Sequence, residues 1–83
     1  MIIERVYIPS IDFTNAMNAV ADPECTRDTM ASFYEDLLRC SFANGTDCID
    51  WKTVNKAILE RWPRGLNYIK TKAWKLAQRK QGS

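Results

Sequence analysis

Apolar side chains recur at helical spacing in four separate stretches of this chain, and this repetition restricts the fold more than any other sequence feature. The clearest stretch contains Met30, Phe33, Tyr34, Leu37 and Leu38. Side chains at positions i, i+3, i+4, i+7 and i+8 lie on one face of an α-helix. The pattern therefore predicts a helix with one buried side, which has to pack against other elements.

A first helix is predicted over residues 11–21, with Ser10 as its N-cap because a Ser hydroxyl can accept a hydrogen bond from a free backbone N–H there. Its apolar face has the same spacing and consists of Phe13, Ala16, Met17, Val20 and Ala21. Residues 2–8 are rich in Ile, Val and Tyr, which favour an extended chain, and Pro9 ends that run. We therefore expect residues 1–9 to form a short extended arm on the helices. The alternatives are an edge that pairs with another copy of the chain and a segment that belongs to the first helix.

The second helix, which carries the clearest stripe, is predicted over residues 23–41. Asp22 suits the N-cap and Pro23 suits the first helical position. Gly45, which follows Asn44, supplies the stop because glycine tolerates the left-handed conformation that ends helices.

A third helix should start after Asp50, which is the expected N-cap, with Ile49 and Val54 spaced as a hydrophobic staple across it. Its buried side is predicted to consist of Trp51, Val54, Ile58 and Trp62. Residues 62–65, Trp-Pro-Arg-Gly, then interrupt the pattern because Pro disfavours helix in the residue before it and Gly weakens helices.

A fourth helix is predicted over residues 66–78, and residues 79–83 are expected to fray. Its apolar face consists of Leu66, Ile69, Ala73 and Leu76. Four short helices with tight connections in 83 residues predict a single all-α domain, 1–83, arranged as a compact bundle with a short extended N-terminal arm.

No set of residues has the spacing of a catalytic or metal site. The chain has no His, and no two cysteines are two to four residues apart. We expect Cys25, Cys40 and Cys48 to be reduced packing residues, with Cys25 in the first turn of the second helix and no His to act as its base. Glu35 and Asp36 diverge by about 100° on a helix and are expected to be solvated. The expectation is a non-enzymatic protein without metal or cofactor.

No segment approaches the roughly 18–20 apolar residues of a membrane-spanning helix. The N-terminus also lacks the basic start and small-residue cleavage site of a secretory signal. We therefore expect a cytoplasmic or nuclear protein that is not secreted and does not bind a membrane.

The charged residues are divided along the chain. Through Asp50 there are three basic and nine acidic residues, a net charge of −6, and from Trp51 onward nine basic and one acidic, a net charge of +8. Lysines and arginines neutralise phosphates, and aromatic rings stack on unpaired bases. The leading hypothesis is therefore nucleic-acid binding through the C-terminal helix. The candidate binding residues are Arg61, Arg64, Lys70, Lys72, Trp74, Lys75, Arg79 and Lys80.

Other interpretations stay open. A helix with its apolar stripe buried also carries lysines simply as its solvated side. A protein-interaction or inhibitory module, of the kind that small regulatory and phage-type proteins provide, would meet a basic partner or an acidic protein surface. A self-assembling homo-oligomer would place the acidic half of one copy on the basic half of another. A continuous basic face would favour nucleic acid, and an exposed apolar patch of several hundred Å² would favour a protein partner.

The order of six apolar residues is similar to the FF domain, a small helical module that binds peptides or phosphorylated tails. These residues are Phe33, Leu37, Leu38, Ile49, Trp51 and Val54. The resemblance covers about a third of the chain, at core positions, and the end of the chain departs from that family's pattern. It implies a helical binding module, and we assign no family on it.

Overall fold

Four α-helices and one short 3-10 helix build the fold, in a computed structural model that describes the backbone of residues 6–81 and the side chains of residues 6–78. The elements are α1 (Pro9–Ala21), α2 (Arg27–Asn44), η1 (Thr46–Cys48), α3 (Trp51–Arg61) and α4 (Leu66–Gln81). No strand occurs between residues 6 and 81. The all-α prediction is therefore confirmed, while residues 1–5 of the predicted arm and residues 82–83 of the predicted tail lie outside the described part.

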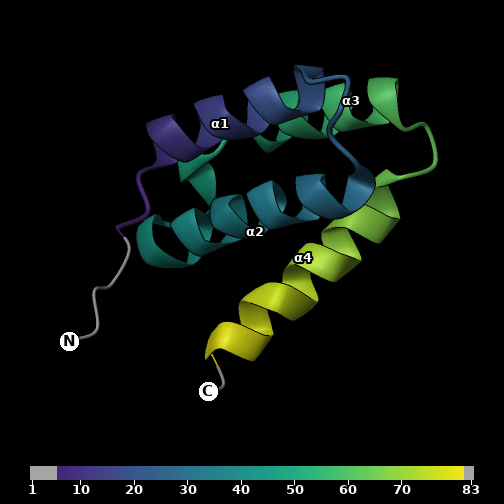
Figure 1. Ribbon diagram of the computed structural model, residues 1–83. Coiled ribbons are helices and arrows are strands. Elements are labelled where there is room, and N and C mark those ends of the chain that lie inside the picture. Colours follow the sequence, from purple (N-terminus) through teal and green to yellow (C-terminus); the bar gives the residue numbers. More distant parts are fainter. Residues whose placement is uncertain (1–5, 82–83) are drawn as a thin grey trace.

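The central helix is α2. It packs against α1 and, most extensively, against α4, and α1 also packs against α3. Figure 1 shows α1 and α3 together on one side of α2, with α4 crossing α2 obliquely on another side. Because α3 and α4 diverge and make little contact with each other, part of the surface of α2 between them stays uncovered.

The core forms where the apolar stripes of the helices meet on α2. Its largest fully buried side chains are Met30, Leu37, Cys40, Val54, Ile58 and Ile69. The stripe predicted for α2 is central to it, although Phe33 and Leu38 are only partly buried at its edge. In α3, Val54 and Ile58 are buried as expected and Trp51 is half-buried, as is Trp62 directly after the helix.

Helix α1 begins two residues earlier than predicted. Pro9 is the first helical residue and Ile8 precedes it, so Ser10 lies inside the first turn and is not the N-cap. A Pro at the first helical position loses no hydrogen bond because that N–H would be unpaired anyway. Ala21, predicted to lie on the apolar face, is exposed because the helix ends there.

Helix α2 begins four residues later than predicted. Thr26 is the N-cap, and its Oγ1 accepts a hydrogen bond from the backbone N–H of Thr29 at 3.2 Å. Asp22 instead accepts from the N–H of Glu24 at 2.9 Å, which places Pro23 in a turn. Asp and Pro favour helix starts and turns alike, and here the turn prevails.

The end of α2 and the starts of α3 and α4 agree more closely with the prediction. Gly45 ends α2 with a φ of 99°, a conformation that favours glycine. Asp50 is the N-cap of α3, and its carboxylate accepts hydrogen bonds from the backbone N–H of Thr53 at 3.2 Å and from its hydroxyl at 2.7 Å. In the α3–α4 turn, a side chain on Gly65 would place its Cβ 2.7 Å from the Cβ of Trp62, so only glycine fits without a shift.

Helix α4 starts at Leu66, as predicted, and runs to Gln81, three residues beyond the predicted end. Ile69 and Ala73 are fully buried on its apolar face. Ala77 is fully buried as well, whereas Leu76 is only half-buried. The buried side of α4 is therefore narrow and consists mostly of small side chains. The backbone of α4 consequently lies close to α2.

Candidate functional site

An open groove lies between α3 and α4 over the C-terminal half of α2, and we call it the aromatic groove. Its volume is about 620 Å³, and residues of α2, η1, α3 and α4 line it. The apolar and aromatic ones are Tyr34, Leu38, Phe42, Trp51 and Trp74. Such a concave, largely apolar surface with a few polar groups is the usual form of a binding site.

Two rings of the groove are fixed by hydrogen bonds within the protein. The ring centroids of Tyr34 and Trp51 lie 5.4 Å apart. The Tyr34 hydroxyl donates to Oδ1 of Asn55 at 3.0 Å, and Nε1 of Trp51 donates to the Thr46 carbonyl at 3.0 Å. Burial raises the pKa of Tyr34 to about 12, so this hydroxyl keeps its proton. The polar atoms of both rings are thus satisfied, and their faces form a rigid floor.

Two further rings stand on the open side of the groove. Phe42 of α2 and Trp74 of α4 meet edge to face, with ring centroids 5.6 Å apart and planes at 75°. Trp74 is 45% exposed and Phe42 is 43% exposed. Two large aromatic side chains that share so much exposed surface beside an apolar groove are typical of an interaction site.

The charge at this groove is positive. Of the residues that the structure describes, Lys70 is the only charged one that lines the groove, and it forms no ion pair with any other of them. Asn55 uses its Oδ1 to accept from Tyr34, which leaves its amide N–H groups as donors. Among the described residues that line it, the groove therefore presents an ammonium, amide donors and the hydroxyls of Ser41, Thr46 and Thr71, and no carboxylate.

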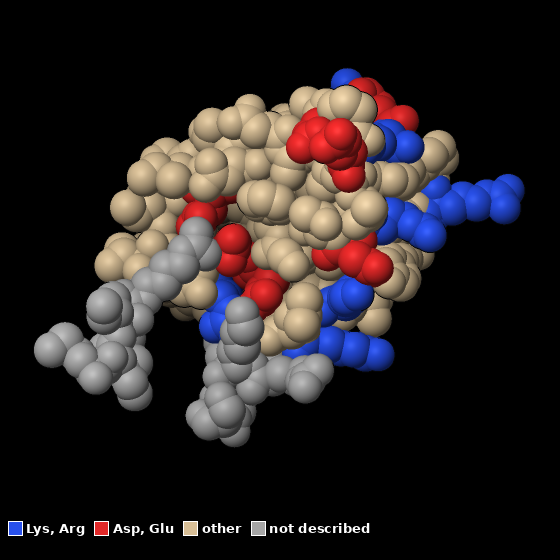
Figure 2. Space-filling model, in the orientation of Figure 1, with Lys and Arg blue, Asp and Glu red and all other residues tan. Residues whose placement is uncertain are grey.

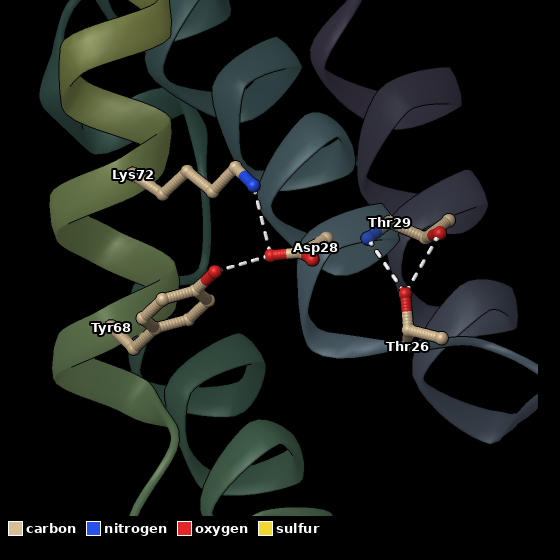
Figure 3. Close-up of polar contacts among 5 residues, drawn as sticks. All are labelled: Thr26, Asp28, Thr29, Tyr68 and Lys72. Atoms are coloured by element: carbon tan, nitrogen blue, oxygen red, sulfur yellow. Dashed lines mark hydrogen bonds and ion pairs between the residues drawn. The ribbon is translucent and has the colours of Figure 1, made fainter.

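A second polar cluster lies on the other side of α4, where that helix meets the start of α2. Figure 3 shows the side chains of Tyr68 and Lys72 converging on Asp28. The Tyr68 hydroxyl donates to Oδ1 of Asp28, and Lys72 Nζ lies 2.9 Å from the same oxygen. The hydrogen bonds from Lys72 and then Tyr68 lower the pKa of Asp28, and the bond to Asp28 raises the pKa of Lys72. The guanidinium of Arg27 lies 5.3 Å from the centre of the Tyr68 ring.

Helix α4 separates the basic residues predicted to bind a partner. At about 100° per residue, Lys70 and Lys72 point roughly 160° apart. Lys70 and Trp74 line the aromatic groove, whereas Lys72 and Lys75 lie on the side of Tyr68. The rest of the predicted set is dispersed: Arg64 is exposed in the α3–α4 turn, and the side chains of Arg79 and Lys80 lie outside the described part.

Arg61, another predicted binding residue, is engaged inside the protein. Its guanidinium lies 4.5 Å from the ring centre of Trp62. It also donates hydrogen bonds to four backbone carbonyls at and after the end of α1, those of Ala19, Val20, Asp22 and Cys25. The last carbonyls of a helix have no partners within the helix, and a cation is well suited to them. Arg61 therefore fastens the end of α3 to the end of α1.

The surface as a whole mixes the two signs of charge. Figure 2 shows Lys and Arg side chains along the right-hand and lower parts of the view, interspersed with Asp and Glu. The division of charge along the sequence is therefore not a division in space on this face, because pairs such as Lys72 and Asp28 join the two halves of the chain.

The expectation that Glu35 is solvated is wrong. Its side chain is buried against α4, and its carboxylate accepts a hydrogen bond from Nε of Arg39 at 2.9 Å. Arg39 in turn donates to the carbonyl of Ala77 in α4 at 3.3 Å. Asp36, its neighbour, is half-buried. Because α4 crosses α2 above Glu35, this acid is covered although it lies off the apolar stripe.

The cysteines occupy packing positions, and all three are free thiols. Cys40 is fully buried and donates from Sγ to the buried Asp12 carboxylate at 3.1 Å. Burial, followed by the nearby Asp12 carboxylate, raises the pKa of Cys40 to about 12. Cys25 lies in the turn before α2 and not in its first turn, and burial raises the pKa of its thiol. Both buried thiols therefore stay protonated, which makes them poor nucleophiles.

Sequence reasoning found Trp74 and Lys70 but not the groove that they line. Phe42, Asn55 and Thr46 were not among the predicted binding residues. One signal was available, because Phe42 and Trp74 are aromatic residues outside the main apolar stripes of their helices, Phe42 about 40° beyond Leu38 and Trp74 about 80° beyond Leu66. An aromatic ring in such a position has to be covered by another element or left exposed.

The fold and its surface define an all-helical domain of four α-helices with an open aromatic groove. Comparison with protein family models, with curated proteins and with solved structures finds no match to this chain. Among the helices of the described residues, none combines the length and hydrophobicity that a membrane span requires. In the same part of the chain, no group of three or more Cys, Asp or Glu side chains is arranged to hold a metal ion.

Proposed function

We propose that this domain is a non-enzymatic protein-interaction module that holds an apolar peptide segment of a partner in the aromatic groove. The observation that carries the proposal is the exposed Phe42–Trp74 pair beside a concave surface whose floor is already rigid. A partner that covers these rings removes a large apolar area from water without ordering the floor first. Buried Trp side chains are among the residues that contribute most to binding at protein interfaces.

The test is a selection of randomised 12-residue peptides displayed on phage, followed by affinity measurements on synthetic copies of the selected peptides. We expect Trp74→Ala to weaken their binding by at least about tenfold, the change typical of a central aromatic residue. Tyr68→Ala is the matched control because Tyr68 lies on the same helix, is equally exposed at 45%, and does not line the groove.

Circular dichroism and thermal unfolding of both variants would show that each remains folded. Selected peptides that bind Trp74→Ala as tightly as the wild-type protein would contradict the proposal. Failure to select any peptide that binds would contradict it as well.

A second candidate function, nucleic-acid binding through α4, is favoured by one observation. Tyr68, Lys72 and Lys75 follow at positions i, i+4 and i+7 of α4 and share a side of the helix, with Arg27 beside Tyr68. Arg79 continues the same spacing in the sequence. Such a row could bring cations to phosphates and a ring to a base. Asp28 neutralises one of its cations, Lys72, which makes this candidate the weaker one.

This second candidate is tested with single-stranded DNA, duplex DNA and RNA probes at low salt. Replacement of Lys72, Lys75 and Arg79 by Glu should abolish binding while the melting temperature changes little. Wild-type affinity for duplex DNA should fall with salt with a log–log slope near −0.9 for each phosphate neutralised. Undetectable binding to every probe would exclude this function.

A further inference from the structure

The cations of this protein differ in whether the chain itself supplies a partner. Lys72 pairs with Asp28, Arg39 pairs with Glu35, and Arg61 is surrounded by backbone carbonyls. Lys70, at the aromatic groove, has no such partner among the described residues. A cation left unpaired next to an exposed apolar site is available to a ligand.

The position of Lys70 ties it to whatever binds Trp74. The two residues are four apart on α4, so their side chains are neighbours on its surface. A partner segment that covers Trp74 therefore also removes water from the Lys70 ammonium. Desolvating an ammonium is unfavourable unless an acceptor, and preferably an opposite charge, replaces the water.

The rest of the groove strengthens this bias toward an acidic ligand. The donors of Tyr34 and Trp51 are used within the protein, which leaves the Asn55 amide and the Lys70 ammonium to meet acceptors, beside the hydroxyl side chains of Ser41, Thr46 and Thr71 that also line the groove. On the opposite wall, exposed Lys52 and Lys56 directly follow the groove residues Trp51 and Asn55. Two exposed acids are next to groove residues: Asp47 follows Thr46, and Asp50, the N-cap of α3, precedes Trp51. Glu35, which follows Tyr34, is buried and paired with Arg39. Three lysines against two exposed aspartates leave the edge of the groove positive.

We infer that the segment held in the aromatic groove carries an Asp or Glu close to its apolar anchor, and that Lys70 binds this carboxylate. The inference rests on the proposed function, since it names the chemistry of the partner for the same groove. The apolar anchor covers Trp74 and Phe42, and the carboxylate replaces the water that Lys70 loses. A basic segment of the same hydrophobicity is rejected, because it would bury like charges together.

The experiment uses the same library of displayed 12-residue peptides, selected separately on the wild-type domain and on Lys70→Gln. Wild-type selections should be enriched in Asp or Glu within about four residues of an aromatic or aliphatic anchor, and Lys70→Gln selections should keep the anchor but lose the acid. For a selected peptide, replacing the acid by its amide should weaken binding to the wild-type domain about two- to fivefold, as expected of an ion pair at the edge of an interface.

The same acid-to-amide replacement should not weaken binding to the Lys70→Gln variant further. It should weaken binding to the control variant Lys75→Gln as much as to the wild-type domain, because Lys75 lies on the other side of α4. Selected peptides that depend on Trp74 but show no acidic enrichment would overturn this inference and leave the proposed function standing. An acid-to-amide effect of equal size in the wild-type domain and in Lys70→Gln would do the same. The proposed function itself would be overturned if peptide binding did not depend on Trp74. It would also be overturned if single-stranded nucleic acid, and no peptide, bound at Trp74.

Discussion

Leu37 shows how much of the stability of the fold depends on one side chain of α2. It has no exposed surface and lies in the middle of the stripe that packs against the neighbouring helices. Leu37→Ala should lower the free energy of unfolding by about 2–5 kcal/mol, the range for a buried Leu. Urea unfolding measures the change, and Leu59→Ala, at a position that is 43% exposed, should lose less than about 1 kcal/mol. Similar losses in the two variants would contradict the assigned core.

Two buried acidic groups should make stability depend on pH in the alkaline range. Burial raises the pKa of the Cys40 thiol and of the Tyr34 phenol to about 12, from ordinary values of 9.0 and 10.0. Because these groups ionise first in the unfolded chain, their contribution is fully present below about pH 9 and is lost as the pH rises toward 12.

The free energy of unfolding should therefore fall across that range in urea titrations. The double variant Cys40→Ala, Tyr34→Phe keeps the shapes nearly unchanged but removes both titrations, so its stability should depend less steeply on pH. An identical pH dependence in the two proteins would show that other groups are responsible.

The residues that sequence reasoning misplaced are mostly polar ones whose environment depends on distant parts of the chain. Periodicity identified Leu37, Val54 and Ile69 correctly because burial of an apolar residue follows from its own helix. Glu35 is buried only because α4 crosses α2 above it, and Arg61 is engaged only because the end of α1 comes close. No local pattern carries that information.

Among the helices, α3 has the start that is easiest to test. Asp50 caps it through two hydrogen bonds to Thr53, so Asp50→Ala should cost about 0.5–2 kcal/mol of unfolding free energy. Asp47→Ala removes an exposed acid three residues earlier that caps no α-helix, and it should be nearly neutral. If both variants lose the same stability, the effect comes from net charge and not from the cap.

The existence and order of the helices could be predicted, whereas some of their ends could not. Asp50 caps α3 and Gly45 ends α2, as the sequence predicts, because each of these residues favours one local backbone conformation over the others. Asp22-Pro23 fits both a helix start and a turn, and Thr26 is an equally good cap four residues later. The choice depends on where α1 ends in space, since Arg61 holds the carbonyl of Asp22.

The whole domain should fold without metal or disulfide, since all three cysteines are free thiols. A chelator together with a reductant should therefore leave the far-ultraviolet circular dichroism and the melting temperature unchanged. A loss of helical signal after this treatment would reveal a hidden metal or disulfide requirement.

Self-assembly through the acidic and basic halves stays a prediction at this scale. Light scattering should then give a mass above the 9.6 kDa of one chain, and the excess should disappear as salt is added. The pairing of Lys72 with Asp28 inside one molecule reduces the charge available for it. A mass that stays at one chain even at low salt would exclude this assembly.

The aromatic groove is a property of the whole molecule, which is why the sequence does not reveal it. Its rings are contributed by α2, α3 and α4, and the groove is open only because α3 and α4 diverge. The angles between helices depend on the fit of side chains across them. Periodicity gives the buried face of each helix but not these angles.

The contact made by Arg61 has a consequence for the order in which the chain becomes structured during synthesis. The carbonyls at the end of α1 leave the ribosome about forty residues before the guanidinium that binds them. Until then the nascent acidic half lacks the cation that binds the carbonyls at the end of α1. The first helix therefore reaches its final stability only after α3 has been made, so that folding of the earliest segment depends on one of the later ones.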